Sequence, residues 1–147
     1  MSDADLLLER LRAVLRDPQA AVWSEGELTG ALRQAYHDLL AASGEAWLIN
    51  GLDGELNPTN FAPHYFALLL RGALGYALLG RAAERVDAFR FDPRHVASAL
   101  AAARLLLEQF QRGLDGLGRL RVRRLQEAEN PPYPPSGGQH QAGWRLE

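Results

Sequence analysis

The sequence predicts an all-α protein: a small bundle of about four helices, followed by an extended C-terminal arm rich in proline and glycine. Apolar residues recur at spacings of three and four along four segments, as on one face of a helix. Helix start and stop signals separate these segments, and the composition changes after Glu129 to NPPYPPSGGQHQAGWRLE. We place the helical domain at residues 1–126 and the arm at residues 127–147. With 147 residues, 47% of them hydrophobic, the chain is long enough for one packed core.

The first helix is expected from about Asp3 to Arg16. Ser2 precedes it as a capping residue, and Pro18 ends it because proline lacks a backbone N–H. Its apolar stripe is formed by leucines spaced three and four apart: Leu8, Leu11 and Leu15. We expect no secretory signal peptide, because the residues from Ser2 to Asp5 are acidic where such a signal needs basic residues.

The second helix begins with the strongest local signature of the chain, WSEGEL at residues 23–28. Ser24 can accept from an early backbone N–H while Glu27 reaches back to the backbone of Ser24, which is a capping box. Trp23 stands just before the cap, where it can pack onto Leu28 as a hydrophobic staple. We predict a helix from about Glu25 to Ala42. Its core face holds residues spaced four, three and four apart: Leu28, Leu32, Ala35 and Leu39.

A turn-rich connection at about residues 45–60 leads to the third helix. Its apolar residues are expected to fill part of the core: Trp47, Leu48 and Ile49. The third helix is expected to start near Thr59 or Asn60, with Pro63 in its first turn, and to end near Val86. Glycine inside a helix costs about 1 kcal/mol relative to alanine, so we expect close helix contact at its small residues: Gly72, Ala73, Gly75, Ala77 and Gly80.

The segment from Phe61 to Gly80 is apolar enough to resemble a membrane span. Arg71 lies at its middle, where a charge costs about 2.5–3.5 kcal/mol on insertion scales. We therefore interpret the segment as a core helix of the bundle and expect no membrane partner.

The fourth helix is expected to begin at Asp92-Pro93, a capping side chain followed by proline at the first helical position. Seven apolar residues then alternate spacings of four and three, a seam suited to bundle packing: Val96, Leu100, Ala103, Leu107, Phe110, Leu114 and Leu117. The second, third and fourth helices should therefore form the core, with the first laid across them. The end of the fourth helix stays open, because RLRVRRL at residues 119–125 fits either an extended strand or a basic helix.

The end of the fourth helix and the arm together form the candidate partner-binding surface. Five of the 16 basic residues lie between Arg112 and Arg124. Guanidinium groups favour carboxylates and phosphates, although a solvated helix end explains the cluster equally well. The arm either stays disordered or orders on a neighbouring subunit, and its aromatic residues are of a kind enriched at interfaces. The candidate partner-binding residues are Arg119, Arg121, Arg123, Arg124, Tyr133 and Trp144.

No catalytic residue, metal site or cofactor is predicted. The chain has no cysteine and no phosphate-binding loop or hydrolase motif. The doublet His37-Asp38 resembles that of helical metal phosphohydrolases, but nothing in the spacing brings a second His and Asp to it. A calcium-loop pattern at residues 53–57 fails because Pro58 stands where such a loop needs glycine. The net charge of −2 argues against binding nucleic acid mainly through bulk charge.

The segment from Arg10 to Leu40 resembles the N-terminal signature of head–tail connector (adaptor) proteins of tailed bacteriophages. In that family an arginine- and leucine-containing helix end with an aspartate is followed by a tryptophan, a capping serine or threonine, and a helix with a central alanine. Those elements read here as Arg12, Leu15, Asp17, Trp23, Ser24, Glu27, Leu28 and Ala35. The later apolar helices agree in order and length, so the resemblance covers about residues 6–112.

The resemblance implies a structural role in the virion neck, after assembly in the host cytoplasm, and no enzymatic activity. Connectors of this family form a ring of about 12 copies under the portal protein of the capsid. The ring extends the channel through which DNA passes, without sequence-specific binding, and it docks the tail or a stopper protein. In the family the C-terminal segment commonly reaches the portal, which points here to residues 119–125 and to the arm from Pro131 to Trp144.

Two other classes remain open at this point. The first two helices, joined by a short turn, could form the helix-turn-helix of a small DNA-binding regulator, although Arg33 is the one clear phosphate contact on the second helix. A helical metal phosphohydrolase would need bound metal near His37.

Overall fold

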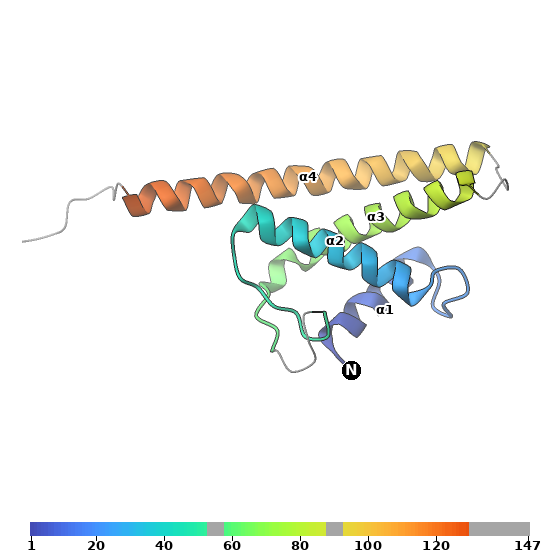
Figure 1. Ribbon diagram of the computed structural model, residues 1–147, viewed down its shortest axis with the longest axis horizontal. Helices are drawn as coiled ribbons and strands as arrows, with labels where there is room; N and C mark the ends of the chain where they lie inside the picture. Colours follow the sequence, from blue (N-terminus) through green and yellow to red (C-terminus); the bar gives the residue numbers. More distant parts are fainter. Residues whose placement is uncertain (53–57, 88–92, 130–147) are drawn as a thin grey trace, which may run out of the picture.

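The computed structural model describes residues 1–52, 58–87 and 93–129, and its helices form a small bundle (Figure 1). Four α-helices and one 3₁₀ turn occur in these residues: α1 Asp3–Leu15, α2 Glu25–Ser43, η1 Pro63–Tyr65, α3 Phe66–Asp87 and α4 Pro93–Glu129. The same ranges contain no strand. The prediction of an all-α bundle is therefore confirmed.

The first two helices lie within one residue of their predicted bounds because their end signals are local. Ser2 and Asp5 form a capping box at the start of α1, and Arg16 closes the helix in the left-handed conformation with φ 55°. Gly44, with φ 69°, ends α2, and its N–H donates to the carbonyl oxygen of Leu40. Glycine is the residue that adopts this conformation without steric cost.

The third helix starts later than predicted. Thr59 and Asn60 are not its first residues, because both are hydrogen-bonded to the connection that precedes them. The N–H of Asn50 donates to Oγ1 of Thr59 at 2.9 Å, and the N–H of Asn60 donates to the carbonyl oxygen of Leu48 at 3.0 Å. Pro63 then opens the 3₁₀ turn, and the α-helix begins at Phe66.

The structure resolves whether residues 119–125, at the end of the fourth helix, form a strand or a helix. α4 is one helix of 37 residues through Glu129, so the strand alternative for residues 119–125 is wrong. Residues 127–129, which we assigned to the extended arm, are helical. Asp92, the expected cap, and the arm at residues 130–147 lie outside the described residues.

The core lies between α2, α3 and α4. Figure 1 shows α3 and α4 side by side and antiparallel, with α2 packed against both and α1 against α2 and α3. The predicted core face of α2 is buried along its whole length, and so are five of the seven seam residues of α4; Leu100 and Leu107 are half-buried. Ile49 is fully buried and Trp47 packs against the same core, as predicted for the connection.

The α1 stripe is rotated relative to the prediction. Its fully buried residues are Ala4, Leu7 and Leu11, whereas Leu8 and Leu15 are half-buried. The N–H of Ala4 donates to the carbonyl oxygen of Asn50 at 3.0 Å. The start of α1 is thereby tied to the connection, on the side of the helix that is buried.

The small residues of α3 allow α4 to approach closely. A Cβ added to Gly72 would lie 2.7 Å from the ring of Phe110, and one added to Gly75 would lie 2.8 Å from Leu107. Close contact is therefore confirmed at these two positions. At Gly80 an added Cβ would meet nothing within 4 Å, so the prediction is wrong there.

One helical stretch in the described ranges, Pro63–Glu84, is long and apolar enough to cross a membrane by length and composition alone. In the bundle it lies between α2 and α4, and Arg71 is exposed at its surface. A core helix of a bundle has the same composition, so this stretch is weak evidence for a membrane span.

Candidate partner-binding surface

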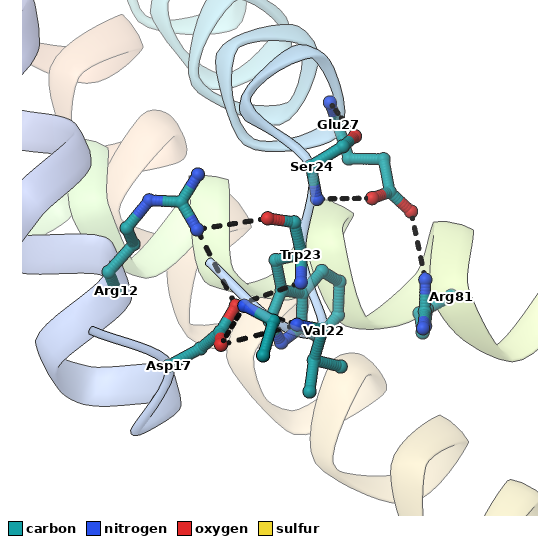
Figure 2. A network of polar contacts seen from close by, with 8 residues as sticks. Arg12, Asp17, Val22, Trp23, Ser24, Glu27 and Arg81 are labelled. Atoms are coloured by element: carbon teal, nitrogen blue, oxygen red, sulfur yellow. Dashed lines mark hydrogen bonds and ion pairs between the residues drawn. The ribbon is translucent and has the colours of Figure 1, made fainter. Parts of the chain in front are cut away.

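The connection between α1 and α2 is organised around the carboxylate of Asp17 (Figure 2). This side chain is buried and accepts three successive backbone N–H groups, from Ala21 at 2.8 Å, Val22 at 3.2 Å and Trp23 at 2.8 Å. A buried carboxylate needs such donors, because its water-facing hydrogen bonds are lost. The backbone hydrogen bond from Trp23 lowers the pKa of Asp17, with further lowering by the bonds from Val22 and Ala21 and by the charge of Arg12.

Trp23 joins three helices at this connection. Its carbonyl oxygen accepts from Nη1 of Arg12 in α1 at 2.9 Å. Its ring is buried in a cluster with Leu28 and Ala31 of α2 and Ala77 of α3, so the predicted staple between Trp23 and Leu28 is present. The guanidinium of Arg81 in α3 lies over the ring, 5.5 Å from its centroid.

The predicted capping box at the start of α2 is also present. The N–H of Glu27 donates to Oγ of Ser24 at 3.2 Å, and the N–H of Ser24 donates to Oε2 of Glu27 at 2.7 Å. The second of these bonds is the main cause of the lowered pKa of Glu27. The other oxygen of Glu27 pairs with Arg81 at 3.3 Å (Figure 2).

Six of the eight residues that carry the family resemblance therefore form, with Arg81, one structural joint, which we call the Trp23 joint: Arg12, Asp17, Trp23, Ser24, Glu27, Leu28 and Arg81. Its carboxylates are occupied by backbone N–H groups and by arginines. The joint thus sets the angle between α1, α2 and α3. Arg81 was missed from the sequence, because it lies 54 residues from Glu27 and no local spacing links the two.

The second feature is the free end of α4, which projects past the rest of the bundle (Figure 1). We call residues 118–129 the α4 extension. Every side chain from residue 119 to residue 129 is exposed, and three of them are large and apolar: Leu120, Val122 and Leu125, at 45%, 53% and 56% exposure. They lie on different sides of the helix, since Val122 lines the groove toward Tyr76 and Leu120 lines one toward Trp47.

Two of the predicted partner-binding arginines hold the extension to α2. Arg121 and Arg124 continue the four-and-three spacing of the seam after Leu117, at the point where the bundle ends. Arg121 donates to the carbonyl oxygen of Ala41 at 3.3 Å, at the C-terminal and partially negative end of α2. Arg124 pairs with Glu45 at 3.2 Å. Both contacts lie within the chain.

The other two arginines lie on the opposite side of the extension, along a shallow groove between α2 and α4. Arg119 and Arg123 line it together with Gly118, Val122 and Tyr76. Arg123 pairs with Glu127 of its own helix at 3.1 Å. Arg119 makes no hydrogen bond or ion pair with the residues that the structure describes, and its charge is available to a partner.

Tyr76 and Asp38 close one end of this groove. The hydroxyl of Tyr76 donates to Oδ2 of Asp38, and Nε2 of Gln34 donates to its Oδ1 at 3.3 Å. Burial and the bond to Asp38 raise the pKa of Tyr76 to about 12.

The other sequence candidates do not come together in a site within the described part of the chain. His37 is exposed beside the ring of Tyr36, and within residues 1–52, 58–87 and 93–129 no three His, Asp or Glu side chains are grouped closely enough to hold a metal ion. The calcium-like pattern at residues 53–57, and Tyr133 and Trp144 of the arm, lie outside the described ranges.

Comparisons with known proteins found no family model, no curated protein and no solved structure that matches the chain.

Proposed function

We propose that the chain is a head–tail connector of a tailed bacteriophage, which forms a ring under the portal, extends the DNA channel and docks the tail or a stopper. The observation that carries this proposal is the α4 extension. At one end of a rigid bundle it presents three exposed apolar side chains and Arg119, which has no partner in the described chain.

The Trp23 joint supports the proposal from the other end of the chain. Of the residues that resemble the connector signature, Arg12, Asp17 and Trp23 bond the end of α1 to the start of α2, and the ring of Trp23 packs against α3. A ring subunit needs such rigidity, because an error in the angle between helices is repeated in every copy.

In this proposal the two C-terminal segments have separate partners. The α4 extension contacts a neighbouring copy, and the arm from Pro131 to Trp144 contacts the portal. The role of the arm rests on its sequence, in which proline pairs favour extended backbone and two aromatic residues provide anchors.

The test is cryo-electron microscopy of the chain mixed with its candidate portal protein, with a chain that ends at Asn130 as the comparison. We expect the full chain to form a ring on the portal and the shortened chain to be absent from it. The shortened chain keeps all the described helices, so circular dichroism should report the same helix content for both.

A full chain that neither binds the portal nor leaves the monomeric state would overturn the proposal. The next measurement would then be the salt dependence of binding to duplex DNA, which a small DNA-binding regulator requires.

A further inference from the structure

Several glycines lie inside helices at positions where nothing in the described chain makes use of them. Gly30 of α2 and Gly80 of α3 both line a groove between these helices, and an added Cβ at either would meet nothing within 4 Å. Gly72 and Gly75, by contrast, are filled by α4. Glycine lowers the stability of a helix. At an open helical glycine, no contact within the free chain compensates for this loss of stability.

This α2–α3 groove has an acidic border. It is lined by Gly26, Glu27, Gly30, Ala77, Gly80 and Glu84. Arg81 lies between the two glutamates, 3.3 Å from Glu27 and 3.8 Å from Glu84. The lining thus holds two carboxylates and one guanidinium.

The α4 extension has the complementary properties. Gly118 in the extension and Gly116 just before it are also open positions, where an added Cβ would meet nothing within 4 Å. Val122 and Leu125 follow them as exposed apolar residues. The extension contains four arginines and two glutamates, Glu127 and Glu129, so its net charge is positive. Arg119 has no partner in the described chain.

The dimensions of the two surfaces agree. The groove follows α2 from Gly26 to Gln34, about 12 Å at 1.5 Å per residue. Residues 118–129 make about three helical turns, so the extension is long enough to cover the groove, and glycines on both sides let the two backbones approach closely.

The two surfaces cannot meet within one molecule. Figure 1 places the C-terminal end of α4 at one end of the long axis, and the N-terminal end of α2 with the C-terminal end of α3 toward the other. A contact between them joins different copies. Since it uses two different surfaces, it either is made twice in a closed two-fold dimer or repeats from copy to copy into a ring or a filament, and the proposed function favours the ring.

We infer that the α4 extension of one copy lies in the α2–α3 groove of a second copy, with Val122 over the open glycines and Arg119 and Arg123 toward the exposed carboxylate of Glu84. This inference deepens the proposed function, on which it rests, by naming the contact that builds the ring.

The test uses the absence of cysteine from the chain. Two full-length variants, Gly30→Cys and Val122→Cys, are oxidised separately and as an equimolar mixture, and the disulfide-linked products are separated on a non-reducing gel. We expect a heterodimer from the mixture and little homodimer from either variant alone, because the contact brings position 30 to position 122. Adding Arg119→Glu and Arg123→Glu to the second variant should reduce the heterodimer at least tenfold.

Two matched controls accompany this experiment. Leu105→Cys puts a thiol at an equally exposed position of α4 outside the extension, and it should give no heterodimer above background with Gly30→Cys. Arg104→Glu with Arg112→Glu makes the same charge change on exposed parts of α4 and should leave the heterodimer unchanged.

A mixture that yields no more heterodimer than the Leu105→Cys control overturns the inference. Homodimers of Val122→Cys as the main product overturn it too, because they report a symmetric contact between extensions. If the cross-link fails to form while the wild-type chain still forms a ring on the portal, this contact is wrong and the proposed function stands. If the cross-link forms but the wild-type chain does not bind the portal, the contact between copies stands and the proposed function is wrong.

Discussion

Arg12 of α1 donates to the carbonyl oxygen of Trp23 at 2.9 Å, so the last turn of the first helix holds the residue that precedes the second. The same guanidinium lies 3.5 Å from the carboxylate of Asp17, which accepts hydrogen bonds from the backbone N–H groups of the connection between the two helices. Side chain and backbone thus fix this connection together. The connection should therefore contribute measurably to the stability of the fold, through Trp23 and through Asp17.

Replacing Trp23 should destabilise the fold strongly. The ring is buried at 7% exposure between α2 and α3, and truncating a buried tryptophan to alanine costs about 3–5 kcal/mol. We expect Trp23→Ala to lower the free energy of unfolding by that amount in urea denaturation. Val22→Ala is the neighbouring control: its side chain is 47% exposed, and its effect should stay within about 0.5 kcal/mol. Equal effects of the two changes would contradict the burial of the ring.

Asp17 should make stability depend on pH in the acidic range. Because folding lowers its pKa from 3.8, the charged carboxylate stabilises the fold above that value. This contribution to the stability of the fold is lost as the pH falls below 3.8 and then through the lowered pKa that Asp17 has in the folded chain. We expect Asp17→Asn to be less stable than the wild type at pH 7 in urea denaturation, with the difference narrowing below about pH 4. Asp115→Asn, an exposed aspartate of α4, is the control, and a difference for Asp17→Asn that is constant from pH 7 to pH 2 would refute the assignment.

Two glycines of the same helix should respond in opposite directions to alanine. At Gly72 the added methyl group would lie 2.7 Å from the ring of Phe110, and such overpacking costs about 1–3 kcal/mol. At Gly80 it enters open space, and the better helix propensity of alanine should stabilise the chain by about 1 kcal/mol. Thermal unfolding of both variants measures the two effects. Unchanged or increased stability of the Gly72→Ala variant would mean that α3 does not pack on α4 as described, and a loss of stability at Gly80 would mean that this position is not open.

Tyr76 should ionise late and contribute to stability at alkaline pH. Its pKa is raised from 10.0 to about 12 by burial and by its bond to Asp38. A raised pKa stabilises the fold fully below pH 10, and this contribution is lost as the pH rises from 10 to 12. Ultraviolet titration of the four tyrosines should contain a late component that Tyr76→Phe removes. If the titration curve of the variant keeps that component, the bond to Asp38 does not form in solution.

The parts of the fold that the sequence predicted are those decided by short-range signals. The capping box of Ser24 and Glu27 and the seam from Val96 to Leu117 depend on spacings of three and four, which a helix brings together wherever it lies. The arginines at the next seam positions after Leu117 mark where the bundle ends, a signal that the sequence analysis did not use.

The parts that were missed depend on contacts between distant segments. Thr59 and Asn60 look like helix-starting residues, but Asn50 and Leu48 bind them and delay α3. Arg81 completes the Trp23 joint from another helix, and the start of α1 is bonded to the connection. Local alternation in residues 119–125 suggested a strand equally well, since a helix that is exposed on all sides leaves no apolar stripe by which to recognise it.

The unbroken course of α4 also has a mechanical consequence. At 37 residues it is about 55 Å long, and about two-thirds of that length is clamped against α3, including the ring of Phe110 beneath Gly72. The helix is therefore a lever with its fulcrum near Arg121. A partner bound to the free end would therefore act on a helix that continues into the centre of the bundle without any intervening loop.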